Sequence, residues 1–361
     1  MKKQHFLWVT FLYAIAVLYL AASAPISPHE AISFYTSSDI VSSLMHVGDT
    51  MFGNLFGLRI LFVFFGFLSI LFFYEFSRRY FDKREDAYLA TFIFMLLPGI
   101  VTGSTLANIA IIVLPFVLLF VLLYEKKHFL LLPFIMLILF FIHDSSIIFF
   151  IALLIYGIIY KDRKLAILAT AFLIAFISLA KGIEIGGRPS GHFAEIFGLY
   201  AAVFSPFVFF YFFYTIYRIF LREKKSLIWY ISFTALLFSL LLSIRQKIGI
   251  TDFAPYVLIA IPLMLNLYHN SLRVRLPEFQ KKYTLGFNVI MATLILSSLS
   301  ILLYQVMFDI TKDTKRFYSN SVYAPYILAE ALKADNLHCY DGTDERERYQ
   351  LQYYNISTCS K

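Results

Sequence analysis

The residues best suited to chemistry lie in one stretch near the N-terminus, residues 25–53. It carries the acids Glu30, Asp39 and Asp49 and the histidines His29 and His46, but no Lys or Arg. Carboxylates without a basic partner can bind a divalent metal ion or act as a general base that removes a hydroxyl proton. We therefore predict Glu30 and Asp49 as catalytic residues and as ligands of any divalent ion. The alternative is an ordinary solvated loop.

Basic residues form a second set of candidates. Arg188 lies in a glycine-rich segment that begins at Lys181, and Arg245 and Lys247 lie in another short polar segment. Because Arg and Lys neutralise phosphate oxygens, these cations predict a phosphate-binding site. The alternative is that they pair with the nearby acids Glu184, Glu195 and Asp252.

Two polar turns complete the candidates. His143 and Asp144 interrupt two apolar runs, and Asn108 closes the turn that begins at Gly103. A His-Asp pair in such a place either caps a helix or belongs to a binding site. We include His143 and Asn108 among the predicted substrate-binding residues.

The amino-acid composition indicates the class of protein to which these residues belong. Apolar residues make up 60% of the 361 residues and charged residues only 15%, with 41 Phe and 25 Tyr. Soluble domains contain about 25% charged residues, so a cytosolic enzyme and a disordered chain are both excluded. Two cysteines cannot make a disulfide framework or a zinc site. The chain is predicted to be an integral membrane protein.

Apolar runs predict an all-α polytopic bundle of about 11 transmembrane helices. A span needs ~20 apolar residues, and the first run follows Lys2 and Lys3 and is interpreted as a retained span rather than a signal peptide. The runs are 6–24, 54–76, 87–102, 106–124, 129–142, 146–160, 165–180, 201–221, 227–244, 253–268 and 285–304.

The positions of the basic residues predict the orientation. Most of the 31 Lys and Arg residues fall in alternate connections, which the positive-inside rule assigns to the cytoplasm. The N-terminus is then inside and the C-terminus outside, in the cytoplasmic membrane of a bacterium. The net charge of +8 is accounted for by topology and does not indicate a nucleic-acid partner. Only five cations fall in short outer segments: Arg59, Lys181, Arg188, Arg245 and Lys247.

The chain divides into residues 1–305, the transmembrane domain with its outer loop 25–53, and residues 306–361, a small outer C-terminal segment. That segment is polar and carries both cysteines, Cys339 and Cys359. An oxidising compartment permits a disulfide between them. Two free thiols are the alternative.

Several motifs together resemble the GT-C superfamily of integral membrane glycosyltransferases. The similarity is greatest to the bacterial branch that contains protein O-mannosyltransferases and the lipid A aminoarabinose transferase. It covers residues 1–125 best. The matching motifs are His29-Glu30-Ala31, His46-Val47-Gly48-Asp49, Gly57-Leu58-Arg59, Leu97-Pro98-Gly99, Thr105-Leu106-Ala107-Asn108, and Arg245 through Asp252 to Tyr256.

The resemblance implies a glycosyltransferase that uses a polyprenyl-phosphate-linked sugar and inverts the sugar's configuration. The acceptor, a glycan, lipid or protein, would lie on the outer face. Glu30 would be the general base, with Asp49 beside it and a divalent metal ion as the possible cofactor. Arg188, Arg245 and Lys247 would hold the leaving phosphate. The remaining substrate-binding residues implied by the motifs are His29, His46, Arg59 and Tyr256.

Two other functions fit the same sequence. A polysaccharide polymerase or ligase would act on lipid-linked glycans through outer arginines. A transporter of lipid-linked substrates would need ionisable residues in mid-span, and those stretches are nearly free of charge.

Overall fold

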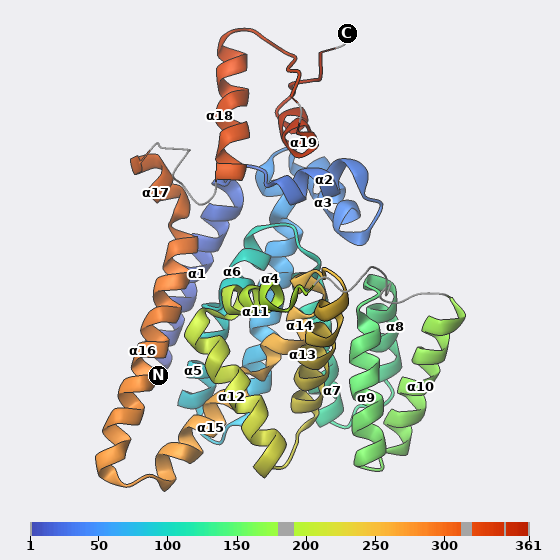
Figure 1. The fold of residues 1–361 in the computed structure, drawn as a ribbon, viewed down its shortest axis with the longest axis vertical. Helices are drawn as coiled ribbons and strands as arrows, with labels where there is room; N and C mark the ends of the chain where they lie inside the picture. Colours follow the sequence, from blue (N-terminus) through green and yellow to red (C-terminus); the bar gives the residue numbers. More distant parts are fainter. Residues whose placement is uncertain (1, 180–190, 312–319, 343, 360–361) are drawn as a thin grey trace. The chain divides into compact units, whose positions relative to one another are not determined.

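The protein is helical throughout the part that the structure describes. The computed structural model describes residues 2–179, 191–311, 320–342 and 344–359 (Figure 1). These residues contain no strand, only an isolated bridge between Cys339 and Ser357. The predicted all-α membrane fold is therefore confirmed. The helices are α1 (Lys3–Ser23), α2 (Pro28–Thr36), α3 (Ile40–Phe52), α4 (Leu55–Tyr80), α5 (Arg84–Met95), α6 (Pro98–Thr105), α7 (Ile109–Glu125), α8 (Leu132–Ile142), α9 (Ser146–Ile159), α10 (Arg163–Ser178), α11 (Phe193–Phe204), α12 (Pro206–Arg222), α13 (Leu227–Arg245), η1 (Ile250–Asp252), α14 (Ala254–Val257), η2 (Leu258–Ala260), α15 (Ile261–Val274), α16 (Pro277–Leu302), α17 (Tyr304–Thr311), α18 (Asn320–Ala334) and α19 (Glu345–Tyr353).

Proline breaks two of the predicted runs. The run 87–102 becomes α5 and α6, which are bent by 61° before Pro98, and the run 201–221 begins in α11 and turns by 107° into α12 at Pro206. Proline has no N–H for the helix ladder and disfavours the helical conformation of the residue before it. Ser205 accordingly leaves the helical region, with φ 77° and ψ 139°.

Among the described residues, five helices are long and apolar enough to cross a membrane, or seven when each bent pair counts as one span. The five are α1, α4, α13, α16 and the segment Ala254–Val274. Helices α7, α8 and α9 are apolar but shorter than the ~20 residues that a straight span needs. The chain is thus a multi-pass membrane protein, and the number 11 stays a prediction.

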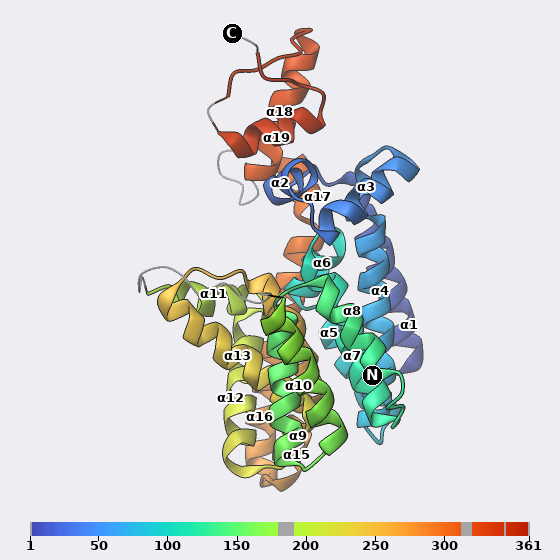
Figure 2. The ribbon, with the colours of Figure 1, turned by 90° about the vertical axis from the view of Figure 1, so that its right-hand side faces the viewer.

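The chain forms two compact units. Unit 1 comprises residues 1–11, 65–101 and 109–299. Within it α9 packs between α10 and α13, and α8 packs on α7 (Figures 1 and 2). The connections α7–α8, α9–α10, α12–α13 and α15–α16, which carry most of the basic residues, lie at one end of this unit, at the bottom of Figure 1. We call it the basic end.

Unit 2 comprises residues 12–64, 102–108 and 300–361. Here α2 packs against α3 and against α19, so the loop 25–53 and the C-terminal segment are one structure. Helices α18 and α19 enclose a small core of Ala329, Leu351 and Ile356. A disulfide joins Cys339 to Cys359, as predicted.

Candidate functional site

The loop 25–53 is ordered by a helix cap. The Ser27 hydroxyl accepts a hydrogen bond from the Glu30 backbone N–H at 3.2 Å, and the Glu30 carboxylate accepts one from the Ser27 N–H at 2.9 Å. This reciprocal pair is a capping box, which satisfies two of the unpaired N–H groups at a helix start. Pro28 follows at the first position of α2, where its fixed φ is favourable. The sequence Ser27-Pro28-His29-Glu30 therefore starts α2.

The Glu30 carboxylate is buried and fully engaged. The Arg59 guanidinium donates to both of its oxygens at 2.7 Å, and the Ala107 backbone N–H donates to Oε1 at 3.0 Å. With the Ser27 N–H on Oε2, each oxygen accepts two hydrogen bonds. Glu30 is 1% exposed and Arg59 0%. No lone pair of Glu30 is left for another ligand.

Arg59 also closes the end of α1. Its remaining N–H groups donate to the backbone carbonyls of Ala21 at 3.3 Å, Ala24 at 2.7 Å and Pro25 at 2.9 Å. The last carbonyls of a helix have no partner within the helix and form the negative end of its dipole, so a cation is favoured there. All five N–H donors of the guanidinium are thus paired.

The environment keeps Glu30 ionised. Burial alone raises the pKa of its carboxyl, but the Arg59 guanidinium and the N–H groups of Ala107 and Ser27 outweigh burial and lower the pKa below its ordinary value. Removing one partner of a buried pair leaves an uncompensated charge, at a cost of about 3–5 kcal/mol. The pair therefore fixes α1, α2, α4 and the segment before α7 to one another.

Asp49 is placed differently from Glu30. Asp39 caps α3 by accepting from the Ser42 N–H at 2.9 Å, and Asp49 lies near the other end of that helix. Its side chain is half-buried, and within the described residues no hydrogen bond or ion pair holds it. Burial and the Asp49 charge raise the pKa of Tyr35. Asp49 is the acid of this loop with a free carboxylate.

Close approach of two glycines fixes α3 against α4. A Cβ on Gly48 would lie 2.1 Å from the Gly57 carbonyl oxygen, and a Cβ on Gly57 would lie 2.7 Å from the Gly48 carbonyl oxygen. Neither position can hold a larger residue without moving the helices. Gly48 precedes Asp49, so this contact sets the position of that carboxylate.

The two predicted histidines lie at the surface of unit 2. His29 is exposed on the first turn of α2. His46 lies 3.0 Å from the Phe34 carbonyl oxygen through Nε2, and its ring packs on Phe34 with centroids 4.1 Å apart. Both rings are accessible to a ligand, and their predicted substrate contact stays untested.

The C-terminal segment completes the loop. The Ile26 N–H donates to the Tyr354 hydroxyl at 3.1 Å, and the Gln350 amide donates to the Ile26 carbonyl at 2.9 Å. Tyr349 stacks on Tyr35 with centroids 6.0 Å apart. Burial, followed by the Asp49 charge, raises the pKa of Tyr353. Sequence reasoning missed these residues, because nothing in a polar tail indicates which loop it contacts.

A cavity of about 160 Å³ lies beside Ser27 in unit 2. Cavities of ~150 Å³ with apolar walls can hold a benzene ring, so this one can take a short hydrocarbon segment. Its walls are mostly apolar and comprise Leu20, Ser27, Thr102, Thr105, Leu106, Ile301, Tyr304 and Val322.

The predicted polar turn at His143 meets the segment that follows Arg245 within unit 1. His143, at the turn between α8 and α9, lies 3.7 Å from the Asp252 carboxylate through Nε2. Its Nδ1 lies 2.7 Å from the Ser145 hydroxyl. Burial raises the pKa of Asp252, and the nearby His143 works against that shift. Both side chains are about one-third exposed, so this His-Asp pair is open to a ligand.

The predicted cations differ in their freedom. Lys247 forms an ion pair with Glu195 at 3.0 Å. Glu195 also pairs with His192 at 2.9 Å. Arg245 ends α13 with an exposed side chain that has no hydrogen bond or ion pair to any described residue. Arg188 and Lys181 lie outside the described residues. Arg245 is thus the cation best able to take a phosphate.

Three further predicted positions are less accessible. Arg59 and Tyr256 are both 0% exposed, and the Tyr256 hydroxyl donates to Ser146 at 3.3 Å. Asn108 is half-buried beside Ala107. Substrate contact at Arg59 or Tyr256 would require these packed networks to open, and for all three residues it stays a prediction.

A metal ion does not fit at Glu30 in this arrangement. No group of three or more His, Cys, Asp or Glu side chains within the described residues could hold one. Every Glu30 oxygen already accepts two hydrogen bonds, so an ion shared with Asp49 would have to displace Arg59 or Ala107. The predicted cofactor stays untested, and no step below depends on it.

The chain resembles known proteins in its structure but not in its sequence. No protein-family model and no curated protein matches the chain by sequence. The crystal structure of ArnT from Cupriavidus metallidurans in the apo state aligns with a TM-score of 0.52 and 13% identity, over 98% of this chain and 75% of ArnT. ArnT bound to undecaprenyl phosphate aligns with a TM-score of 0.54 and 12% identity, over 99% of this chain and 77% of ArnT.

The chain has the fold of ArnT. The predicted likeness to GT-C membrane glycosyltransferases is thereby confirmed for the fold. At this identity the alignment carries no residue roles from ArnT to the chain. The role of each residue in this chain is therefore argued from the geometry within each unit.

Proposed function

We propose that this protein is a membrane glycosyltransferase. It moves a sugar from a polyprenyl-phosphate-linked donor to an acceptor on the outer face of the bacterial cytoplasmic membrane. The observation that carries the proposal is the fold shared along nearly the whole chain with ArnT, one of whose structures holds undecaprenyl phosphate. The loop 25–53 supports it, because this loop presents a free carboxylate on a rigid frame.

The reaction needs a base and a stabilised leaving group. The acceptor hydroxyl oxygen forms a bond to the anomeric carbon, and the bond from that carbon to the phosphate oxygen breaks. The hydroxyl proton passes to the base, and polyprenyl phosphate leaves with its additional negative charge. Attack on the face opposite the phosphate inverts the anomeric configuration.

Asp49 is the better-placed base of the two predicted acids. A base needs a free lone pair within reach of the acceptor hydroxyl. Asp49 has a half-buried carboxylate without a hydrogen-bond partner in the described chain, whereas Glu30 has none of its lone pairs free. Glu30 acts in this proposal as a positioning residue, since its pair with Arg59 holds the loop that carries Asp49.

Arg245 is the proposed phosphate contact. A charge-assisted hydrogen bond to phosphate strengthens as negative charge develops on the leaving group. Lys247 is already neutralised by Glu195, so its contribution is smaller. The cavity beside Ser27 would hold a short hydrocarbon segment of the donor's polyprenyl chain.

Transfer in proteoliposomes tests this function. The purified chain would be reconstituted with undecaprenyl phosphate that carries a radiolabelled sugar, and envelope extracts would supply acceptors. We expect label to move from the lipid to an acceptor and free undecaprenyl phosphate to accumulate in equal amount. The proposal fails if neither transfer nor retention of undecaprenyl phosphate by the protein is observed across a panel of lipid-linked sugars.

A further inference from the structure

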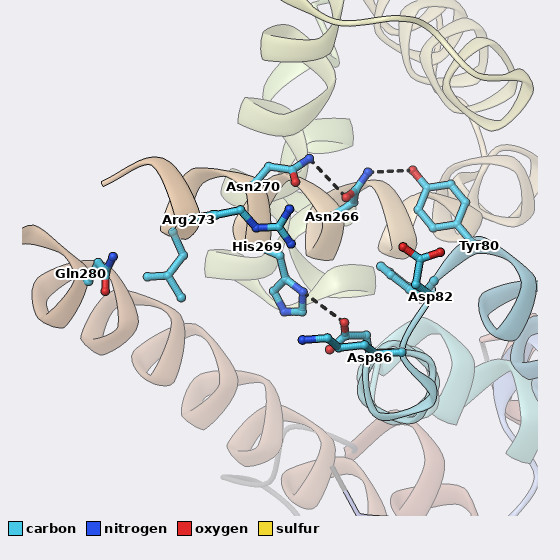
Figure 3. A pocket seen from close by; sticks show the side chains of 11 residues that line it. Tyr80, Asp82, Asp86, Asn266, His269, Asn270, Arg273 and Gln280 are labelled. Carbon is cyan, nitrogen blue, oxygen red and sulfur yellow. Dashed lines mark hydrogen bonds and ion pairs between the residues drawn. The ribbon is translucent and has the colours of Figure 1, made fainter. Parts of the chain in front are cut away.

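A cavity at the basic end of unit 1 has no part in the proposed transfer. Its volume is about 420 Å³, within the ~300–1,000 Å³ typical of small-molecule sites. One wall is the end of α4 and the start of α5, with Tyr80, Asp82 and Asp86. The facing wall is the last turns of α15, with Asn266, and the start of α16 (Figure 3).

Hydrogen-bonding groups cross this cavity in an ordered chain. The Asn270 amide donates to the Asn266 carbonyl oxygen at 3.2 Å, and the Asn266 amide donates to the Tyr80 hydroxyl at 3.4 Å. Asn266 and Asn270 lie on one face of α15, one helical turn apart, so their side-chain amides point the same way (Figure 3). A polar ligand would find both donors and acceptors along this line.

The charges in the cavity have both signs. His269 lies 3.4 Å from Asp86, so these two groups are occupied with each other. Asp82 and Arg273 are exposed, extend from opposite walls and have no hydrogen bond or ion pair to any described residue (Figure 3). Lys83 also lines the cavity, so a ligand that fits must offer a negative group to Arg273 or Lys83 and a positive group to Asp82.

The cavity opens where three spans end. Tyr80 is the last residue of the span Leu55–Tyr80, Arg273 lies in the last turn of the span Ala254–Val274, and Gln280 lies in the first turn of Pro277–Leu302. Such ends lie at headgroup depth, just outside the ~30 Å hydrocarbon core. Beside the cavity, α16 presents apolar side chains outward: Phe279 is 51% exposed and Leu285 63%.

We propose that this cavity binds the headgroup of a zwitterionic phospholipid of the phosphoethanolamine type. The phosphate accepts hydrogen bonds from Arg273, and the primary ammonium donates to Asp82 and to the Asn270 carbonyl oxygen. The acyl chains lie along the exposed face of α16. An anionic glycerol headgroup brings no cation to Asp82, and a trimethylated choline has no N–H to donate.

Native mass spectrometry of the full chain in detergent tests the site, with phosphatidylethanolamine, phosphatidylcholine or phosphatidylglycerol added. We expect phosphatidylethanolamine to be retained at least tenfold more tightly than the other two. Asp82→Asn should abolish this preference, and Arg273→Gln should weaken all three lipids. The control Lys126→Gln removes a charge elsewhere at the basic end and should change neither result.

Several outcomes would overturn the proposal. These are equal retention of the three lipids, a preference for phosphatidylglycerol, or an Asp82→Asn variant that keeps the wild-type preference. Calorimetric titration with free phosphoethanolamine separates the two sources of this headgroup. Binding as tight as that of the lipid would assign the cavity to a soluble ligand and overturn the lipid assignment. Because the lipid assay needs no sugar transfer, its result is independent of the proposed function.

Discussion

Arg59 holds Glu30 by two hydrogen bonds of 2.7 Å, and the same guanidinium binds the carbonyl groups that end α1. Arg59, a buried cation that follows Glu30 by 29 residues in the sequence, thus joins the first helix to the loop that follows that helix. Glu30, which the sequence predicts as a catalytic base, is the residue through which Arg59 holds this loop, and its catalytic role stays a prediction. The acid of this loop whose carboxylate has no hydrogen bond or ion pair to a described residue is Asp49, near the end of α3.

Glu30→Gln should lower the thermal stability of the protein. The substitution leaves Arg59 buried without its counter-ion, which costs about 3–5 kcal/mol. Glu30→Leu combined with Arg59→Leu should lose less stability than the two single losses added together, because no unpaired charge remains. Melting curves in detergent measure this, and additive losses would show that the two side chains do not interact.

Acid should weaken the Glu30–Arg59 ion pair and lower the stability of the folded protein. The pKa of Glu30 is lowered in the folded protein, so its contribution to stability is fully present above the unfolded pKa of ~4.3 and is lost as pH falls through the lower folded value. The melting temperature should therefore contain an acid limb below about pH 4 that Glu30→Gln lacks. An identical limb in wild type and variant would contradict this assignment.

The C-terminal segment should depend on its disulfide. Closing a loop of 20 residues stabilises a fold by roughly 3 kcal/mol. Cys339→Ser together with Cys359→Ser should speed proteolysis within residues 320–359, and peptide mapping would show it. Cleavage at the wild-type rate would mean that α18 and α19 hold together without the bridge.

Arg245→Ala should weaken use of the donor at least tenfold, since a charge-assisted contact is worth about 1.5–3 kcal/mol. Arg222→Ala is the matched control, because it is exposed at the end of α12 at the basic end. Arg218 is unsuitable, since it bonds to Tyr214 and Ser271. Equal losses in both variants, measured as KM for the lipid-linked sugar, would indicate damage to folding.

The predicted orientation of the chain in the membrane can be measured with reporter fusions. An alkaline phosphatase fusion after Lys361 should be active, and a fusion after Lys225 should be inactive, because the enzyme folds only outside the cytoplasm. The reverse pattern would remove the outer face from the proposed function and leave the cavity between α4 and α15 on the outer side.

The sequence predicted the helices better than the contacts between them. Each predicted apolar run coincides with one or more helices over its described residues, because apolar stretches leave the backbone no other way to satisfy its hydrogen bonds in a membrane. The run ending near Thr102 and the run beginning near Ala201 contain bends before Pro98 and Pro206, which hydropathy does not register.

The site was only partly predictable, for a different reason. The Ser27-x-x-Glu30 pattern is a capping signal and could have assigned Glu30 to the start of a helix. The partner Arg59 was recognised as unusual but not as the counter-ion of Glu30. Gln350 and Tyr354 contact Ile26 from more than 300 residues away, and no local pattern encodes such a contact.

The most direct test of the account is single-turnover sugar transfer by Asp49→Asn. A general base contributes about 10²–10⁴ in rate, so transfer from undecaprenyl-phosphate-linked sugar should slow by that factor, with the melting temperature and donor binding unchanged. Asp39→Asn is the matched control and should transfer at the wild-type rate, since Asn caps a helix as well as Asp does. Near-full transfer by Asp49→Asn would contradict the account and leave the His143–Asp252 pair as the next candidate base.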